Sequence, residues 1–354
     1  MSEAPAYDIA FLICSERSGS NLIRAMMDAH SEVAAPPPFH IGRELGANFH
    51  ATLGEGAASP AWTKLRAQML QRIKRLDSAE LAEDVAARFD GLPALDMGGV
   101  LRAFYDAVMS RTNARLLFIK ENNVHRIQFM LLHCFPDAKF VFQVRDPRDF
   151  LLSGKERRAG RFGNKFGSTR HALEVWREDQ QGGLATLAYL GPERVHLQRY
   201  EDLIADPERV LSALCHRLGL AFEPAMLDFH KERRNQRFAK MGEQWGNLKN
   251  PVIAGNSKRY RSGLSPSTIR TVEAHLGDLM RRFGYALDYA DPPPGYFRHI
   301  FLPHVMEAIE KRANGERTGF YSNGSGKIET EIEAMAGPLE LPYGRIAEGD
   351  EAGP

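Results

Sequence analysis

The chain has 354 residues, and its 46 lysine and arginine residues nearly balance its 45 aspartate and glutamate residues, which leaves a net charge of +1. This balance argues against a nucleic-acid partner bound through net charge, and no apolar run approaches the roughly 18 residues that a membrane helix needs. The three cysteines lie far apart in apolar stretches, and the first residues do not form a signal peptide, so we expect buried thiols in a cytoplasmic enzyme.

Short apolar runs alternate with helical patterns along the chain. The first run, at 7–14, has almost no polar interruption, which suits a strand covered on both faces. Three further strands are expected at 115–120, 138–144 and 194–200. The helices that follow the four strands are expected at 21–30, at 124–135, from 147 onward and at 207–218. This alternation predicts a three-layer α/β/α fold with a central parallel sheet.

Residues 42–117 are expected to form a helical insertion over the sheet edge, with helices at 62–76, 81–89 and 100–109, which would shape an acceptor pocket. We expect one domain over 1–290. The break ADPPPG, a helix at 302–313 and a loosely ordered Gly/Pro/acid-rich tail from 315 onward would follow.

Two Arg-rich stretches, 155–170 and 231–240, are expected to be solvated faces. The alternatives are a rim for an anionic ligand and a docking patch for a membrane surface.

A loop rich in serine and glycine follows the first expected strand, at 15–20. Small side chains let backbone N–H groups approach an anion, and the helix N-terminus adds partial positive charge. Arg17 adds a fixed positive charge, and Ser18 and Ser20 add hydroxyl donors. By itself the loop fits either phosphate binding or an ordinary structural connection from strand to helix, and the Walker A pattern is absent.

Arg145 lies where the third expected strand ends and a helix begins. Asp146 as N-cap and Pro147 as first helical residue explain the start of the helix, but they do not explain Arg145. The carboxyl ends of strands are where α/β folds bind ligands, and Ser153, two helical turns on, could reach the same anion. Tyr200 lies at the end of the fourth expected strand and either fills the core or offers its ring to a nucleobase.

In this order, the segments RSGS at 17–20, RDPRDFLLS at 145–153 and YEDL at 200–203 resemble the PAPS-dependent sulfotransferase family, in its bacterial form. The resemblance covers about 7–285 and implies the family's P-loop nucleotide-binding fold. It also implies transfer of a sulfuryl group from PAPS (3′-phosphoadenosine 5′-phosphosulfate) to a hydroxyl, or less favourably an amine. The acceptor would be a small molecule or a glycan- or lipid-type compound. PAP would be the product, and no metal would be required.

The same resemblance implies roles for individual residues. Arg17 and Lys120 would stabilise charge on the departing nucleotide during transfer. The implied cofactor contacts are Arg17, Ser18, Gly19, Ser20 and Asn21 for the 5′-phosphosulfate, Arg145 and Ser153 for the 3′-phosphate, Tyr200 near the adenine, and Lys258 and Arg259 as a late basic contact.

The general base is not fixed by these motifs. The proline run before His40 lacks the glutamate that many members of the family carry there, and no histidine directly follows Lys120. His40 is our first choice, because a histidine pKa near neutrality suits base catalysis. Glu44, Glu121 and His125 remain alternatives for the base, and the alternative interpretation of His40 is a loop histidine hydrogen-bonded to backbone.

Two other functions stay open. An ATP-dependent small-molecule kinase would share the sheet and phosphate loop, and a non-catalytic nucleotide-binding module would keep the pocket without the base. The sequence has no GxSxG, HExxH or Cys-x-x-Cys pattern, so we expect neither a hydrolase nor a metal site. A homodimer is an open alternative for the assembly.

Overall fold

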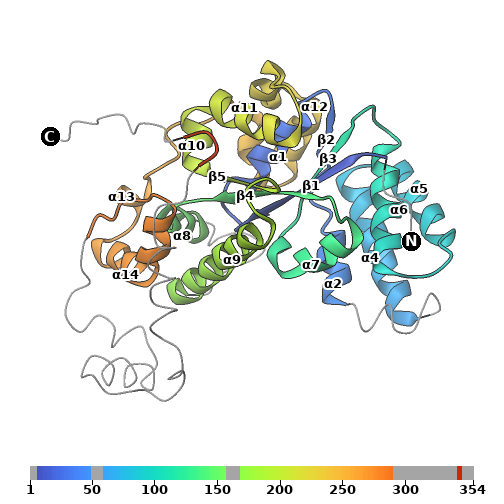
Figure 1. Ribbon diagram of the computed structural model, residues 1–354, viewed down its shortest axis with the longest axis horizontal. Helices are drawn as coiled ribbons and strands as arrows, with labels where there is room; N and C mark the ends of the chain where they lie inside the picture. The colour runs from blue at the N-terminus through green and yellow to red at the C-terminus, as the bar shows by residue number, and fades with distance from the viewer. Residues whose placement is uncertain (1–5, 49–58, 157–167, 290–340, 345–354) are drawn as a thin grey trace, which may run out of the picture. The chain divides into compact units, whose positions relative to one another are not determined.

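The computed structural model describes residues 6–48, 59–156, 168–289 and 341–344. Its centre is a parallel sheet in the order β2-β3-β1-β4-β5 (Figure 1). The strands are β1 (Asp8–Cys14), β2 (Val33–Ala34), β3 (Leu116–Lys120), β4 (Lys139–Val144) and β5 (Val195–Arg199). The predicted parallel sheet is confirmed. β2 was not predicted, because two residues are too few to show a periodicity.

Side chains of β1 point alternately to the two faces of the sheet, and each face is covered by its own cluster of apolar side chains. The sheet is therefore the middle of three layers. Ala10, Leu12 and Cys14 join the apolar core with α1 (Ser20–Asp28) and α11 (Pro207–Leu218). Phe11 instead contacts an aromatic cluster, whose other members are Tyr105, Phe135 and Phe140. Figure 1 shows α1 and α11 on one side of the sheet and α7 (Val124–Cys134) on the other.

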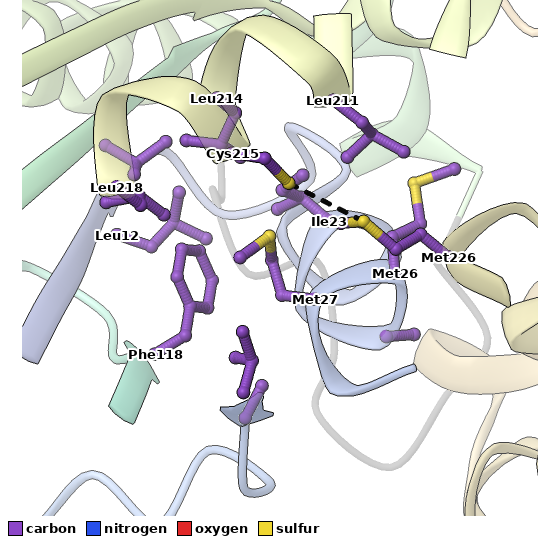
Figure 2. Close-up of a cluster of buried hydrophobic side chains, with 14 of the residues drawn as sticks. Leu12, Ile23, Met26, Met27, Phe118, Leu211, Leu214, Cys215, Leu218 and Met226 are labelled. Carbon is purple, nitrogen blue, oxygen red and sulfur yellow. Dashed lines mark hydrogen bonds between the residues drawn. The ribbon is translucent and has the colours of Figure 1, made fainter. Parts of the chain in front are cut away.

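Sulfur-containing side chains fill much of the core between α1 and α11 (Figure 2). Met26 and Met27 of α1 meet Leu214 and Cys215 of α11, and the Cys215 Sγ lies 3.7 Å from the Sδ of Met226. Burial raises the pKa of the Cys215 thiol to about 12. All three cysteines are free and buried, as predicted.

The segment between β2 and β3 is helical, as predicted, and 49–58 lies outside the described residues. Ser59, Ser78 and Asp96 each precede one of its helices and accept hydrogen bonds from first-turn N–H groups, which explains where these helices begin. The helices are α2 (Ile41–Ala47), α4 (Pro60–Leu76), α5 (Ala79–Asp90) and α6 (Met97–Met109).

The chain divides into two compact units. The first contains 1–145, 178–256 and 341–354, and the second contains 146–177 and 257–340. Beyond the elements above, the first unit holds α10 (Tyr200–Ala205), η1 (Pro224–Lys231), α12 (Arg233–Met241) and η2 (Glu243–Lys249). The second holds α8 (Pro147–Lys155), α13 (Tyr260–Gly263) and α14 (Pro266–Arg282), and α9 (Thr169–Leu190) runs from the second into the first.

The second unit is organised around a buried arginine. Arg148 donates to Asp146 at 2.7 Å and to Glu273 at 2.6 Å, and its guanidinium lies 4.1 Å from the centre of the Tyr260 ring. The two carboxylates compensate the buried positive charge, which fixes α8 and α14 to each other.

Several expectations fall outside the described residues. These are the helix at 302–313, most of the basic stretch at 155–170, and the tail apart from 341–344. None of the helices in the described ranges combines the length and the apolar character that spanning a bilayer requires.

Candidate functional site

The loop between β1 and α1 turns through two left-handed residues, with φ of 69° at Arg17 and 79° at Gly19. Gly19 is the N-cap of α1. A Cβ placed on Gly19 would lie 2.2 Å from Cδ2 of Tyr200, so the tyrosine ring rests against bare backbone. Position 19 therefore requires glycine both for its conformation and for the close approach of the ring.

Hydrogen bonds from neighbouring elements fix this loop. The Ser18 hydroxyl donates to the carbonyl of Ser15 at 2.5 Å, and the Ser18 side chain is fully buried. Gln143 of β4 donates to the carbonyl of Ser18 at 2.6 Å, and Gln180 of α9 donates to the Ser15 hydroxyl at 2.7 Å. The Ser18 hydroxyl thus shapes the loop, and its predicted contact with an anion stays a prediction.

Arg145, at the carboxyl end of β4, joins the loop to Tyr200. Its guanidinium carbon lies 4.5 Å from the centre of the Tyr200 ring, and its nitrogens donate to the carbonyls of Arg17 at 2.7 Å and Asn256 at 3.3 Å. The Asn256 amide donates to the Tyr200 hydroxyl at 2.6 Å. An arginine stacked on an aromatic ring in this way offers a cation and a flat face at one place.

These residues line one pocket of the first unit. Its polar part contains Arg17 and Arg145 together with the start of α1. The remaining wall is largely apolar and comes from α1, η1, η2 and the loop after η2: Leu22, Phe229, Leu248, Pro251, Val252 and Ile253. A basic end beside an apolar wall suits a ligand with anionic groups and a flat organic ring.

A second polar cluster lies where β3 ends. Lys120, with 7% of its surface exposed, pairs in register with Leu12 of β1 and donates to the Asn122 side chain at 2.7 Å. The Asn122 amide donates to Glu16 of the loop at 2.6 Å, and its backbone N–H donates to Nδ1 of His40 at 3.3 Å. The structure thus brings the predicted residues Lys120 and His40 together.

The two carboxylates weighed as bases are engaged in other contacts. Glu121 accepts from the N–H groups of Gly42 at 3.0 Å and Arg43 at 2.8 Å, which holds the start of α2, and burial raises its pKa. Glu44 pairs with Arg43 at 2.8 Å and Arg72 at 3.2 Å. Burial alone would raise the pKa of Glu44, but these two arginines lower it overall.

The two histidines differ in their surroundings. His40 is half-buried, with a left-handed backbone at φ 57°, and contacts Asn122. His125 has Nδ1 3.5 Å from Oδ1 of Asp179. Burial lowers the pKa of His125 and raises that of Asp179 to about 7.

Three predicted cofactor contacts belong to the second unit. Ser153 is buried in α8, Lys258 has a left-handed backbone at φ 56°, and Arg259 pairs with Glu156 at 2.6 Å. Their contact with the phosphate predicted for Arg145 stays a prediction.

Glu16, Asn122 and Asn256 were not predicted as site residues. Asn122 lies in the stretch after Lys120 that lacks a histidine, and Asn256 lies in a loop without a motif. Within the described ranges, no group of three or more His, Cys, Asp or Glu side chains is arranged to hold a metal ion.

Residues 10–224, more than half of the chain, match the sulfotransferase family. The chain belongs to the sulfotransferase family. The family predicted from the three motifs is therefore confirmed, and with it the prediction that the chain is a sulfotransferase. Among its relatives is the protein-tyrosine sulfotransferase 2 of Gallus gallus, 26% identical over 284 residues, which cover 78% of this sulfotransferase and 69% of the relative.

Two solved structures share the fold of this sulfotransferase. The sulfotransferase domain of the Synechococcus PCC 7002 olefin synthase has a TM-score of 0.61 at 22% identity, covering 81% of this chain and 98% of that one. The sulfotransferase domain of the curacin biosynthetic pathway has a TM-score of 0.53 at 24% identity, covering 80% and 100%. The predicted fold is therefore confirmed.

Proposed function

We propose that this sulfotransferase binds PAPS in the pocket of its first unit and transfers the sulfuryl group to a hydroxyl, or less favourably an amine, releasing PAP. One observation carries the proposal: Arg145 is stacked on Tyr200 in a pocket that Arg17 also lines. Two cations and an aromatic face thereby meet at the carboxyl ends of parallel strands, where α/β folds bind nucleotides.

The chemistry of the pocket fits this cofactor. Gly19 has no side chain to cap α1, so the first N–H groups of the helix suit the 5′-phosphosulfate. The Tyr200 ring and the apolar wall suit the adenine, because aromatic stacking on a base is worth about 1–3 kcal/mol. Arg145 would hold the 3′-phosphate, joined by Ser153, Lys258 and Arg259 in our proposal.

When bound, PAPS supplies an activated sulfuryl group and PAP as its leaving nucleotide. Arg17 and Lys120 provide the positive charge that stabilises the departing oxygen. Lys120 is nearly buried and is held by Asn122, so its charge acts in a medium of low dielectric with its position already fixed.

His40 is the proposed contact to the acceptor, because it touches Asn122 beside Lys120. Since Nδ1 accepts the N–H of Asn122, Nε2 carries the proton in the neutral ring. In this tautomer His40 donates a hydrogen bond, and it acts as a base only once its bond to Asn122 opens. Glu44, Glu121 and His125 remain the alternatives for the base.

The acceptor class is proposed as a hydroxyl compound, either a small molecule or a glycan- or lipid-type compound. The chicken relative is a protein-tyrosine sulfotransferase, so we include a phenolic hydroxyl among the candidate acceptors. We further propose that PAPS suffices without a metal and that the protein works in the cytoplasm.

Calorimetric titration of the purified protein with PAP and with ADP, each with and without magnesium, tests the cofactor. We expect micromolar PAP binding without metal and much weaker ADP binding. Magnesium-dependent ADP binding tighter than PAP binding would instead favour a kinase. PAP release from PAPS is then followed with phenolic, carbohydrate and amine acceptors. PAP binding without turnover on any acceptor would favour a non-catalytic nucleotide-binding module.

A further inference from the structure

Four residues far along the chain, 341–344, belong to the first unit and lie beside α10, where Figure 1 shows them in red. The N–H of Gly344 donates to the carbonyl of Leu341 at 3.0 Å, which closes a turn with Pro342 in its second position, a place that favours proline. The sequence predicted a loosely ordered tail from 315 onward, whereas residues 341–344 form a hydrogen-bonded turn.

The Tyr343 hydroxyl enters a closed polar network. It accepts from the backbone N–H of Arg199 at 2.9 Å and donates to Oδ2 of Asp202 at 2.8 Å. The Arg199 side chain donates to both oxygens of the same carboxylate, at 2.8 and 2.6 Å. Burial and the Asp202 carboxylate raise the pKa of Tyr343, so its hydroxyl keeps the proton that it donates.

The backbone of the segment is also bound. Arg209 of α11 donates from two nitrogens to the carbonyl oxygen of Tyr343, at 2.9 and 2.6 Å. The next residue, Gly344, has φ 71°, and a Cβ there would meet the Arg209 guanidinium at 3.1 Å. Tyr343 is only 7% exposed and belongs to the apolar core. Both the side chain and the backbone carbonyl of Tyr343 are therefore hydrogen-bonded within the first unit.

The residues that receive Tyr343 flank Tyr200. Arg199 is the last residue of β5 and the N-cap of α10, and Asp202 lies in the first turn of that helix. In the described sheet β5 is an edge strand, so its N–H groups on one side have no neighbouring strand to bind. The tyrosine hydroxyl supplies that acceptor one residue before Tyr200.

We propose that 341–344 is an intrachain docking segment that positions Tyr200, so that affinity for the nucleotide depends on whether the segment is docked. Tyr343 is then a positioning residue, since it acts through Arg199 and Asp202. This inference rests on the proposed binding of PAPS at Tyr200. By linkage, a segment that raises PAP affinity must itself be held more tightly once PAP is bound, by the same factor.

The first experiment compares PAP binding to the wild type and to Tyr343→Phe. The variant keeps the ring but leaves the Arg199 N–H and Asp202 without this partner, so we expect a PAP dissociation constant about 10-fold higher. The KM for PAPS should rise alike, with kcat at saturating PAPS unchanged. Tyr189→Phe makes the same chemical change at a tyrosine that is 68% exposed and should alter neither constant.

The second experiment measures hydrogen exchange of the peptide that contains 341–344, with and without PAP. Reciprocity predicts slower exchange with PAP in the wild type and a smaller effect in Tyr343→Phe. Leu218→Ala, which weakens the same core without touching Arg199 or Asp202, controls for a general loss of stability. It should lower the free energy of unfolding but leave PAP affinity unchanged.

The outcomes separate the two proposals. If the wild type fails to bind PAP, the proposed function fails. If it binds PAP and Tyr343→Phe binds equally well, or if PAP leaves exchange in the segment unchanged, the docking proposal is wrong. Should Tyr343→Phe not fold, Arg209→Gln weakens the hold on the Tyr343 backbone and carries the same expectation.

Discussion

The ring of Tyr200 lies so close to Gly19 that a Cβ at position 19 would fall 2.2 Å from its Cδ2 atom. The loop between β1 and α1 and the start of α10 therefore pack closely, because Gly19 has no side chain between them. Any side chain at position 19 must displace the ring that Arg145 stacks on.

Gly19→Ala should weaken PAP binding by about 10-fold or more, because the ring has to leave its place and the left-handed backbone costs an alanine about 1–2 kcal/mol. Gly219→Ala is the matched control: its φ is 80° against 79° at Gly19, and nothing lies within 4 Å of its added Cβ. We expect Gly219→Ala to lower the melting temperature with no change in PAP affinity. Equal PAP affinity in both variants would contradict the fit of ring to loop.

Arg145→Ala should raise the KM for PAPS by roughly 10- to 150-fold, as expected for a charge-assisted bond worth about 1.5–3 kcal/mol. The measurement is binding of PAP and of the analogue that lacks the 3′-phosphate. Only PAP should lose affinity strongly. An equal loss for both nucleotides would assign Arg145 to shaping the pocket through its bonds to Arg17 and Asn256.

Lys120→Ala should lower kcat by about 10²–10³, as for removal of a preorganised donor. Asn122→Ala leaves the ammonium in place but removes the oxygen that orients it, so a smaller loss of about 10-fold is expected. Both variants should bind PAP with a nearly normal dissociation constant. A fall in PAP affinity with unchanged kcat would move Lys120 from the transfer step to cofactor binding.

The pH–rate profile decides the role of His40. His40→Asn places an amide near the Nδ1 position, and His40→Gln places one near Nε2. If His40 donates from Nε2, His40→Gln should retain more activity and kcat/KM should keep its acidic limb. Loss of that limb, together with near-complete inactivity of both variants, would identify His40 as the base.

His196 should make the protein acid-sensitive. It is fully buried, and burial first, then the charge of Arg217, lowers its pKa from 6.5 to about 3. Between these values the unfolded chain binds a proton that the folded chain does not. The free energy of unfolding therefore falls as pH drops below 6.5, by up to about 1.4 kcal/mol per pH unit.

Urea denaturation at pH 7.5, 6 and 5 checks this expectation, and His196→Gln should show a shallower decline than the wild type. His133→Gln, at an exposed histidine, serves as control and should follow the wild-type curve. A wild-type decline that persists unchanged in His196→Gln would exclude this residue as its source.

Local sequence was enough for four of the five strands of the described sheet and for the pocket's basic residues. β1, β3 and β4 are mainly apolar runs, whereas β5 is the mixed run VHLQR. Arg145 and Tyr200 directly follow β4 and β5, and Arg17 lies in the loop after β1, where a parallel sheet brings them together. Motif order then led to the family.

The hydrogen bonds between loops that hold the site together could not be predicted from local sequence patterns. The bond from Asn122 to Glu16 joins loops whose mutual approach depends on backbone geometry, including the left-handed conformation at Arg17. The contact of Tyr343 could not be predicted for another reason. Its four-residue segment has no periodicity, and its partner Asp202 lies 141 residues earlier in the sequence.

The same separation has a meaning for biosynthesis. Tyr343 is added 141 residues after Asp202, which at about 5–20 residues per second is an interval of roughly 7–28 s. Throughout that time the ribosome-bound chain already has Tyr200 but not the hydroxyl that caps the strand before it. Because all five described strands precede Tyr343 in the chain, the nascent protein passes through a stage in which these strands have been synthesised while the site that binds Tyr343 is still empty.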